Sequence, residues 1–293
     1  MEETLNNKEY CRSCGAPLYG KFCSECGEKK FDKKDLSFKK IFSQFIDVLT
    51  HFDSKILKSV KLLITKPGYL AKEYCSGSRV KYAKPLQLFF IINVVFFIML
   101  SFARINTFTT PLRVHMNNLT TESWLAKPMV EHKLGKENIT PEEYSKRLAD
   151  YTNKFDTKVN LFSKSLIIII VPIFAFFLHV LFINKKRLYA ENFIFSLNFF
   201  SWLLLFNVLF LALLYIIGFI GKIFNFSMND IDDTILGPLT FTAIGVYCFY
   251  GALRFYNEKR WISFLKCVTA PFLFLWSLNI YRFILFLITY YST

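Results

Sequence analysis

Apolar and polar positions are strongly segregated along this chain. Residues 1–85 are polar and basic, whereas most of the remainder falls into long apolar runs separated by short polar loops. A helix needs about 20 apolar residues to cross a bilayer, and five runs come close to that length. The expected transmembrane helices are at about 86–103, 165–183, 193–221, 235–256 and 264–290. The pattern predicts an all-α polytopic membrane protein, with a transmembrane helical domain over 86–293.

The polar stretch between the first two expected spans, 104–164, carries a helical signal of its own. Thr140-Pro141-Glu142-Glu143 fits an N-cap, a proline at the first helical position and a capping box. Apolar residues then recur at spacings of three and four as far as Phe162, which predicts a helix running into the second span. The expected packing partners are earlier apolar residues of the same stretch: Leu119, Trp124, Leu125, Met129 and Leu134. We therefore expect an external helical loop.

The lysines and arginines of the short loops predict the orientation. Loops 184–192 and 257–263 are basic, whereas loop 222–234 has one lysine and three aspartates. This bias predicts a cytosolic N-terminus and an external C-terminus. Loop 104–164 contains ten Lys and Arg and argues the other way, but it is about as long as the limit beyond which the rule loses force. A four-span alternative with one re-entrant run places the C-terminus inside.

Composition and charge agree with this membrane interpretation. The chain is 53% hydrophobic and 18% aromatic, with 35 Phe, which exceeds what a soluble domain of this length needs. The formal net charge of +14 is explained by the loop bias, and the aromatic residues of the basic region lie at helical spacing rather than as a stacking platform. The expected partner is therefore the lipid bilayer and not nucleic acid.

A basic juxtamembrane region occupies residues 31–85. Residues 33–84 contain twelve Lys and Arg against four acidic residues, and apolar residues recur at helical spacing over 38–60. Such a helix can lie in the membrane interface with its lysines at anionic headgroups, or pack on the transmembrane bundle. Both interpretations stay open. Pro67-Gly68 predicts the end of this helix, and Gly77-Ser78-Arg79 predicts a turn.

The strongest motif lies in residues 1–30. Two Cys-x-x-Cys-Gly units occur, with eight residues between Cys14 and Cys23, and each glycine allows a tight turn. Four thiolates suit a tetrahedral Zn²⁺ ion, and so short a segment needs a metal to supply its folding energy. Since protein fills all four positions, no position remains for a substrate. We predict a zinc-ribbon module with one structural zinc ion as cofactor, bound by Cys11, Cys14, Cys23 and Cys26.

Other uses of the four cysteines are weaker. Iron in a rubredoxin-like site takes the same ligands, so the sequence leaves zinc and iron open. An iron–sulfur cluster lacks supporting spacing, and a redox Cys-x-x-Cys normally occurs in a β-α-β context that is missing here. Two disulfides are disfavoured in a reducing cytosol.

The chain resembles an uncharacterised bacterial family of membrane proteins, a domain-of-unknown-function family with an N-terminal four-cysteine zinc ribbon. The resemblance rests on the cysteine pattern and on the following residues: Leu63, Lys66-Pro67-Gly68, Tyr74, Gly77-Ser78-Arg79, Tyr82 and Pro85. It covers about residues 11–100, and the later spans only by hydropathy. It implies a bacterial inner-membrane location and brings no activity.

The sequence contains no nucleophile–base pair, phosphate loop or paired carboxylates, so we expect no catalytic residues and no enzyme. The leading hypothesis is a non-enzymatic scaffold, docking or regulatory protein whose zinc ribbon contacts a protein partner. The alternative is a small-solute transporter or channel with a polar path along Asn198, Asn207, Asn279 and Arg282.

Few ionisable residues fall within the expected spans. His179, Lys266 and Arg282 are functional candidates by default, although each can snorkel to a headgroup. The asparagines of the spans fit hydrogen bonds between helices. The aspartates of loop 222–234, at 230, 232 and 233, lack the glycine and the ligand spacing of a calcium site, so we expect a solvated loop there.

Overall fold

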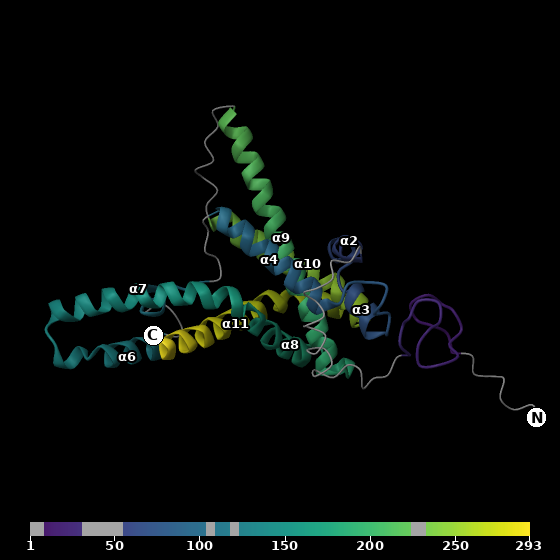
Figure 1. Ribbon diagram of the computed structural model, residues 1–293, viewed down its shortest axis with the longest axis horizontal. Helices are drawn as coiled ribbons and strands as arrows, with labels where there is room; N and C mark the ends of the chain where they lie inside the picture. Colours follow the sequence, from purple (N-terminus) through teal and green to yellow (C-terminus); the bar gives the residue numbers. More distant parts are fainter. Residues whose placement is uncertain (1–8, 31–54, 104–108, 118–122, 224–232) are drawn as a thin grey trace, which may run out of the picture. The chain divides into compact units, whose positions relative to one another are not determined.

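The computed structural model describes residues 9–30, 55–103, 109–117, 123–223 and 233–293. The regular secondary structure of these residues is helical, and their strand-like pairing is limited to two isolated bridges, in agreement with the expected all-α class (Figure 1). The helices are α2 (Lys55–Thr65), α3 (Tyr69–Cys75), α4 (Pro85–Ala103), α5 (Leu112–His115), α6 (Ser123–Leu134), η2 (Lys136–Asn138), α7 (Pro141–Leu166), η3 (Ile167–Ile169), α8 (Ile170–Leu181), η4 (Ile183–Lys185), α9 (Tyr189–Ile223), α10 (Asp233–Phe255) and α11 (Arg260–Ser292).

Four helical segments of the described residues are long and apolar enough to cross a membrane. They are Pro85–Phe102, Pro141–Leu181, Tyr189–Ile216 and Arg260–Ser292. The fourth expected span, 235–256, coincides with α10, which has 23 residues but is not one of these four. The chain therefore has the helices of a membrane protein. The span at 235–256, and with it the external C-terminus, stays a prediction.

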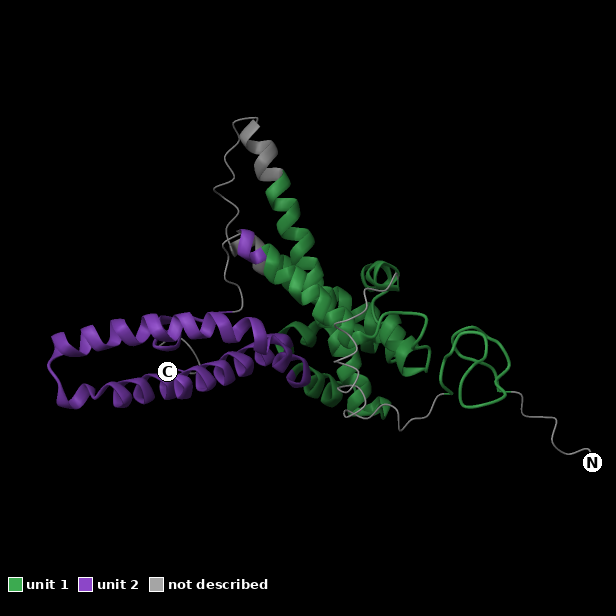
Figure 2. Cartoon of the chain, in the orientation of Figure 1, with its two compact units in different colours: residues 1–99, 174–273 green, residues 100–173, 274–293 purple. Residues whose placement is uncertain are grey.

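The chain divides into two compact units (Figure 2). Unit 1 comprises residues 1–99 and 174–273, and unit 2 comprises residues 100–173 and 274–293. The metal motif, the juxtamembrane helices, α9 and α10 belong to unit 1.

In unit 1, the short helix α3 lies against α9 and α10. Its N-cap Gly68 has φ of 76°, and a Cβ added there would lie 3.0 Å from the Cα of Gly251 on α10. The Arg254 guanidinium donates to the carbonyl of Pro67 at 2.7 Å. Pro67-Gly68 therefore ends the preceding helix, as predicted, and also forms the contact that holds α3 to the bundle.

The helix α2 contains the described part of the amphipathic helix expected in the juxtamembrane region. It buries Ile56, Ser59 and Leu63, and the Ser59 hydroxyl accepts a hydrogen bond from the Ala83 amide at 2.9 Å. This part of the region packs on the protein. The remainder of the expected amphipathic helix, 38–54, lies outside the described residues, so its interfacial placement stays a prediction.

A buried polar chain joins α8, α9 and the end of α10. The Tyr256 hydroxyl donates to Asn192 Oδ1 at 2.6 Å, and Asn192 Nδ2 lies 3.1 Å from His179 Nδ1. Since the amide nitrogen can only donate, Nδ1 of His179 accepts this hydrogen bond. His179 was expected to be able to snorkel, but Nδ1 at the edge of its ring forms a hydrogen bond with Asn192. Sequence reasoning missed Asn192 altogether.

The two basic loops of unit 1 are joined by one buried carboxylate. Glu258 is 8% exposed, and its oxygens lie 3.1 Å from Lys185 Nζ and 3.3 Å from Lys266 Nζ. Lys266 also donates to Asn184 Oδ1 at 2.9 Å. Burial raises the pKa of Glu258, but the hydrogen bonds from Lys185, Asn184 and Lys266 outweigh it and lower the pKa overall. Lys266 is thus a partner of Glu258 rather than a residue that only snorkels.

In unit 2, α7 has the predicted start and the predicted apolar stripe. The Thr140 hydroxyl accepts from the Glu143 amide, and Tyr151, Phe155 and Val159 are buried. The expected partner residues are correct only in part. Leu134 is buried, but Trp124 is 75% exposed. Between them, α6 buries Ala126 and Val130 instead. Leu119 lies outside the described residues.

The last part of α11 supplies packing for unit 2 that the sequence did not indicate. The ring of Phe286 lies 5.8 Å from Phe155 and 5.0 Å from His115. The Tyr281 hydroxyl donates to the Ser163 carbonyl at 3.1 Å, and Tyr290 donates to the Met129 carbonyl at 3.1 Å. Residues of the expected span 264–290 therefore contribute to the core of this unit.

Candidate metal centre

Four sulfur atoms come together in the N-terminal segment of unit 1. The thiol groups of Cys11, Cys14, Cys23 and Cys26 lie within 4.8 Å of one another. Two pairs, Cys11–Cys26 and Cys14–Cys23, have their Sγ atoms 3.5 Å apart. This is the cluster that the sequence predicted, and it can hold a metal ion.

The backbone builds the cluster from two copies of one turn, related by an offset of twelve residues. In the first, Cys11 N donates to the Ala16 carbonyl at 2.7 Å and Gly15 N donates to Cys11 O at 2.8 Å. In the second, Cys23 N donates to the Glu28 carbonyl at 2.8 Å and Gly27 N donates to Cys23 O at 2.9 Å. Both glycines have positive φ, 80° and 71°, which a side chain would oppose. Each turn therefore presents its two thiols on one side.

The spacing of the sulfurs suits a tetrahedral ion. Bonds of about 2.3 Å from Zn²⁺ to each thiolate place the four sulfurs about 3.8 Å apart, close to the 3.5 Å measured here. A disulfide needs a separation of about 2.05 Å, so neither close pair is one, and all four cysteines are free thiols. The donor set of four sulfurs fits zinc or iron, and it leaves no coordination position for a substrate.

The thiols of this cluster differ in acidity. Burial raises the pKa of Cys11, but N–H bonds from Cys14 and Ser13 outweigh it and lower the pKa to about 7. Burial raises the pKa of Cys26 to about 12. Without metal, Cys11 therefore loses its proton more readily than Cys26 does. Because a metal ion must displace the remaining protons, its affinity falls as the pH falls.

The second turn carries a buried carboxylate that the sequence analysis did not single out. Glu28 is 5% exposed, and its Oε2 accepts hydrogen bonds from the amides of Arg79 and Val80, both at 2.8 Å. The Ser13 hydroxyl donates to the same oxygen at 2.5 Å. A carboxylate on two successive amides is a charge-assisted contact. Comparison of the two turns was the available signal, because the first turn has Ala16 at the equivalent position.

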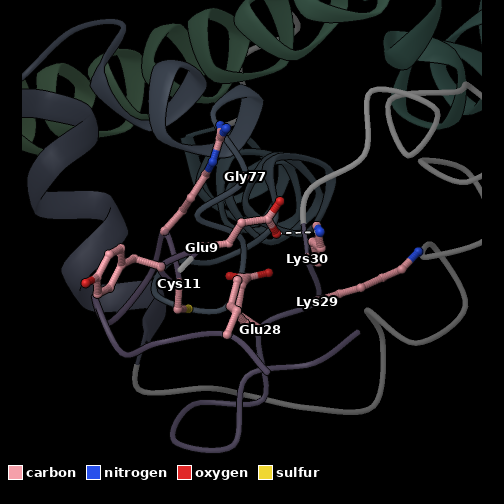
Figure 3. A pocket seen from close by; sticks show the side chains of 9 residues that line it. Glu9, Cys11, Glu28, Lys29, Lys30 and Gly77 are labelled. Carbon is pink, nitrogen blue, oxygen red and sulfur yellow. Dashed lines mark ion pairs between the residues drawn. The ribbon is translucent and has the colours of Figure 1, made fainter. Parts of the chain in front are cut away.

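A second contact joins the module to the same turn of the chain. Arg12 donates to the Ser76 carbonyl at 2.5 Å, and the Ser13 and Ser78 hydroxyls lie 3.3 Å apart. A cavity of about 250 Å³ adjoins this contact. Figure 3 shows Glu9, Glu28 and Lys30 around it, with Gly77 of the turn on its wall and an ion pair between Glu9 and Lys30. The contact therefore includes several hydrogen bonds that lie beside a hollow.

The residues of the alternative polar path are divided between the two units. Asn198 and Asn207 belong to unit 1, whereas Asn279 and Arg282 belong to unit 2. Asn207 donates to Leu203 O of its own helix at 2.7 Å. Of the three aspartates, 230 and 232 lie outside the described residues, and the side chain of the third is likewise not described.

Comparison with known proteins identifies one segment. Residues 53–97 match a protein family described as a protein of unknown function, DUF3667. The segment includes α2, α3, the turn that receives Glu28, and the first part of α4. This agrees with the expected resemblance to an uncharacterised family. No curated protein and no solved structure matches the chain.

Proposed function

We propose that the chain is a non-enzymatic protein of the bacterial inner membrane whose cytosolic zinc ribbon docks a protein partner. The observation that carries the proposal is the four-sulfur cluster with no open coordination position. A metal closed in this way organises a fold and performs no chemistry on a substrate. The module then acts through its surface.

That surface has the composition of a protein-binding site. Tyr10, Tyr19 and Phe22 are 61%, 86% and 62% exposed on a segment of only 22 described residues. Aromatic residues are enriched at the centres of protein interfaces and contribute most of the binding energy there. A protein partner therefore fits this face better than a small solute does.

The proposal is tested by metal analysis joined to cross-linking in native membranes. The purified full-length protein should contain one zinc ion, and X-ray absorption should show four sulfur neighbours at about 2.3 Å. The double variant Cys11→Ser, Cys23→Ser should lose both the metal and the cross-linked protein partners.

A second variant separates docking from folding of the module. Tyr19→Ser with Phe22→Ser should keep the zinc and lose the partners. Tyr291→Ser is the matched control, because Tyr291 is 78% exposed but lies outside the module. If the cysteine variant retains every cross-linked partner of the wild type, the docking role is wrong.

Transport of a small solute is the second candidate function. It is favoured by Asn198 of α9, which is 1% exposed and whose two amide atoms have no hydrogen-bond partner among the described residues. A buried polar group of this kind in a membrane span costs free energy unless it serves a polar path. The test is solute flux in proteoliposomes. A transport role predicts flux that Asn198→Leu abolishes, whereas absence of flux for ions and small polar solutes excludes it.

A further inference from the structure

We infer that metal loading of the four-cysteine module controls a clamp on the juxtamembrane segment, and that Glu28 is the residue through which it acts. The inference rests on the proposed docking role and adds its regulation. The loaded module holds the turn Ser76–Val80, and the module that has lost its metal releases it. The turn that the module holds thus lies within the segment 53–97.

The first argument is the position of Glu28 in the module. Its carbonyl closes the second turn around Cys23, so its backbone belongs to the metal site, while its carboxylate leaves the module and binds the Arg79 and Val80 amides. The carboxylate is therefore directed correctly only when the turn is closed. Since the module is too short to fold without metal, removal of the ion removes the geometry of the clamp.

The second argument is the asymmetry of the two turns. The first turn closes through the Ala16 carbonyl with the same hydrogen bonds as the second. A carboxylate is therefore not needed to bind metal. Its presence at the second turn, buried and with three donors on one oxygen, is explained by the contact with the chain 50 residues further on.

The third argument is charge. The described module contains four basic residues and three acidic ones, and Zn²⁺ bound to four thiolates adds a net charge of −2. The loaded module is therefore negative. The described juxtamembrane residues 55–84 contain eight Lys and Arg against a single acidic residue. Metal loading thus creates an attraction between the module and the segment that it contacts.

The contact is also of a kind that can open. Its hydrogen bonds include those that the Glu28 carboxylate accepts, that between the Ser13 and Ser78 hydroxyls and that which the Arg12 guanidinium donates, and it adjoins a cavity of about 250 Å³. Because the carboxylate accepts from two amides of the turn, the contact depends on correct placement of that carboxylate. Loss of the charge-assisted bonds to the two amides should therefore be enough to release the turn.

The test is hydrogen–deuterium exchange of the full-length protein in nanodiscs, followed at the peptide that contains Arg79 and Val80. In the metal-loaded wild type these amides should be protected. After chelation of the metal they should exchange about tenfold faster or more, which is the loss expected for hydrogen bonds to a charged acceptor. The same increase is expected for Glu28→Ala with its metal still bound.

Matched variants make the outcome decisive. Glu28→Gln keeps an acceptor without the charge and should give an intermediate rate, whereas Glu25→Ala, at an exposed acidic position of the same turn, should exchange like the wild type. Metal content measured on every sample shows whether the module is intact. Equal exchange with and without metal, or a metal-loaded Glu28→Ala protein with wild-type protection, would overturn the clamp. Partner cross-linking is a separate readout, so failure of the clamp and failure of the docking role are distinguishable.

Discussion

Replacing Gly68 by alanine should separate α3 from the membrane helices. A left-handed backbone conformation costs a residue with a side chain roughly 1–2 kcal/mol, and Gly68 has φ of 76°. The added Cβ would also lie 3.0 Å from the Cα and 3.1 Å from the carbonyl oxygen of Gly251. Those atoms are backbone and cannot rotate away, so overpacking adds about 1–3 kcal/mol. The expected loss of stability is about 2–5 kcal/mol in total.

Two other glycines separate these contributions. Gly135 has φ of 70° but nothing within 4 Å of an added Cβ, so Gly135→Ala should show only the conformational cost of about 1–2 kcal/mol. Gly20 has neither feature, and Gly20→Ala should leave the stability within about 0.5 kcal/mol of the wild type. The assay is unfolding of the purified full-length variants in mixed micelles of increasing SDS content, followed by circular dichroism. A Gly68→Ala protein no less stable than Gly135→Ala would refute the close-packing argument.

Three further perturbations test the polar contacts. Metal retention should fall as the pH is lowered from 7 to 5, because protons compete for the thiolates; zinc content that is constant over this range contradicts a thiolate site. Glu258→Gln should destabilise the protein by about 2–4 kcal/mol near pH 7, since two lysines lose a buried partner. The lowered pKa of Glu258 means that its contribution is present above about 4.5 and is lost as the pH falls below that value, so the variant and the wild type should converge in acid. Asn192→Leu should cost about 1–3 kcal/mol and Tyr256→Phe about 1 kcal/mol in the SDS assay, because the first leaves two partners unsatisfied; the reverse order would contradict the hydrogen-bonded chain.

The sequence predicted best those features whose chemistry is local. The Cys-x-x-Cys-Gly spacing predicted the sulfur cluster, Pro67-Gly68 predicted the end of α2, and Thr140 predicted the cap of α7. In each case the residues that fix the structure are within a few positions of one another. Periodicity and turn chemistry are then sufficient.

Features that depend on distant partners were not predictable in this way. No local pattern indicates that a glutamate after a Cys-x-x-Cys-Gly unit accepts hydrogen bonds from amides about 50 residues away. The hydrogen bond between Asn192 and Tyr256 likewise forms only through the packing of the helices. Hydropathy had a different limit in α11, because it registers that a side chain such as Phe286 is apolar and not whether it contacts lipid or protein.

In the twelve-residue repeat, different residues form the metal site and the contact with the rest of the chain. Both turns close through backbone atoms. The side chain that follows the glycine of each turn, at residues 16 and 28, can therefore change without altering the metal ligands. The carboxylate at residue 28, which has no counterpart at residue 16, adds the two amide contacts between the module and the chain. Exchanging the two residues, as Ala16→Glu with Glu28→Ala, should keep the metal and remove those two contacts. A repeat of this kind allows the binding contacts of the module to change, by selection or by design, while its metal ligands stay the same.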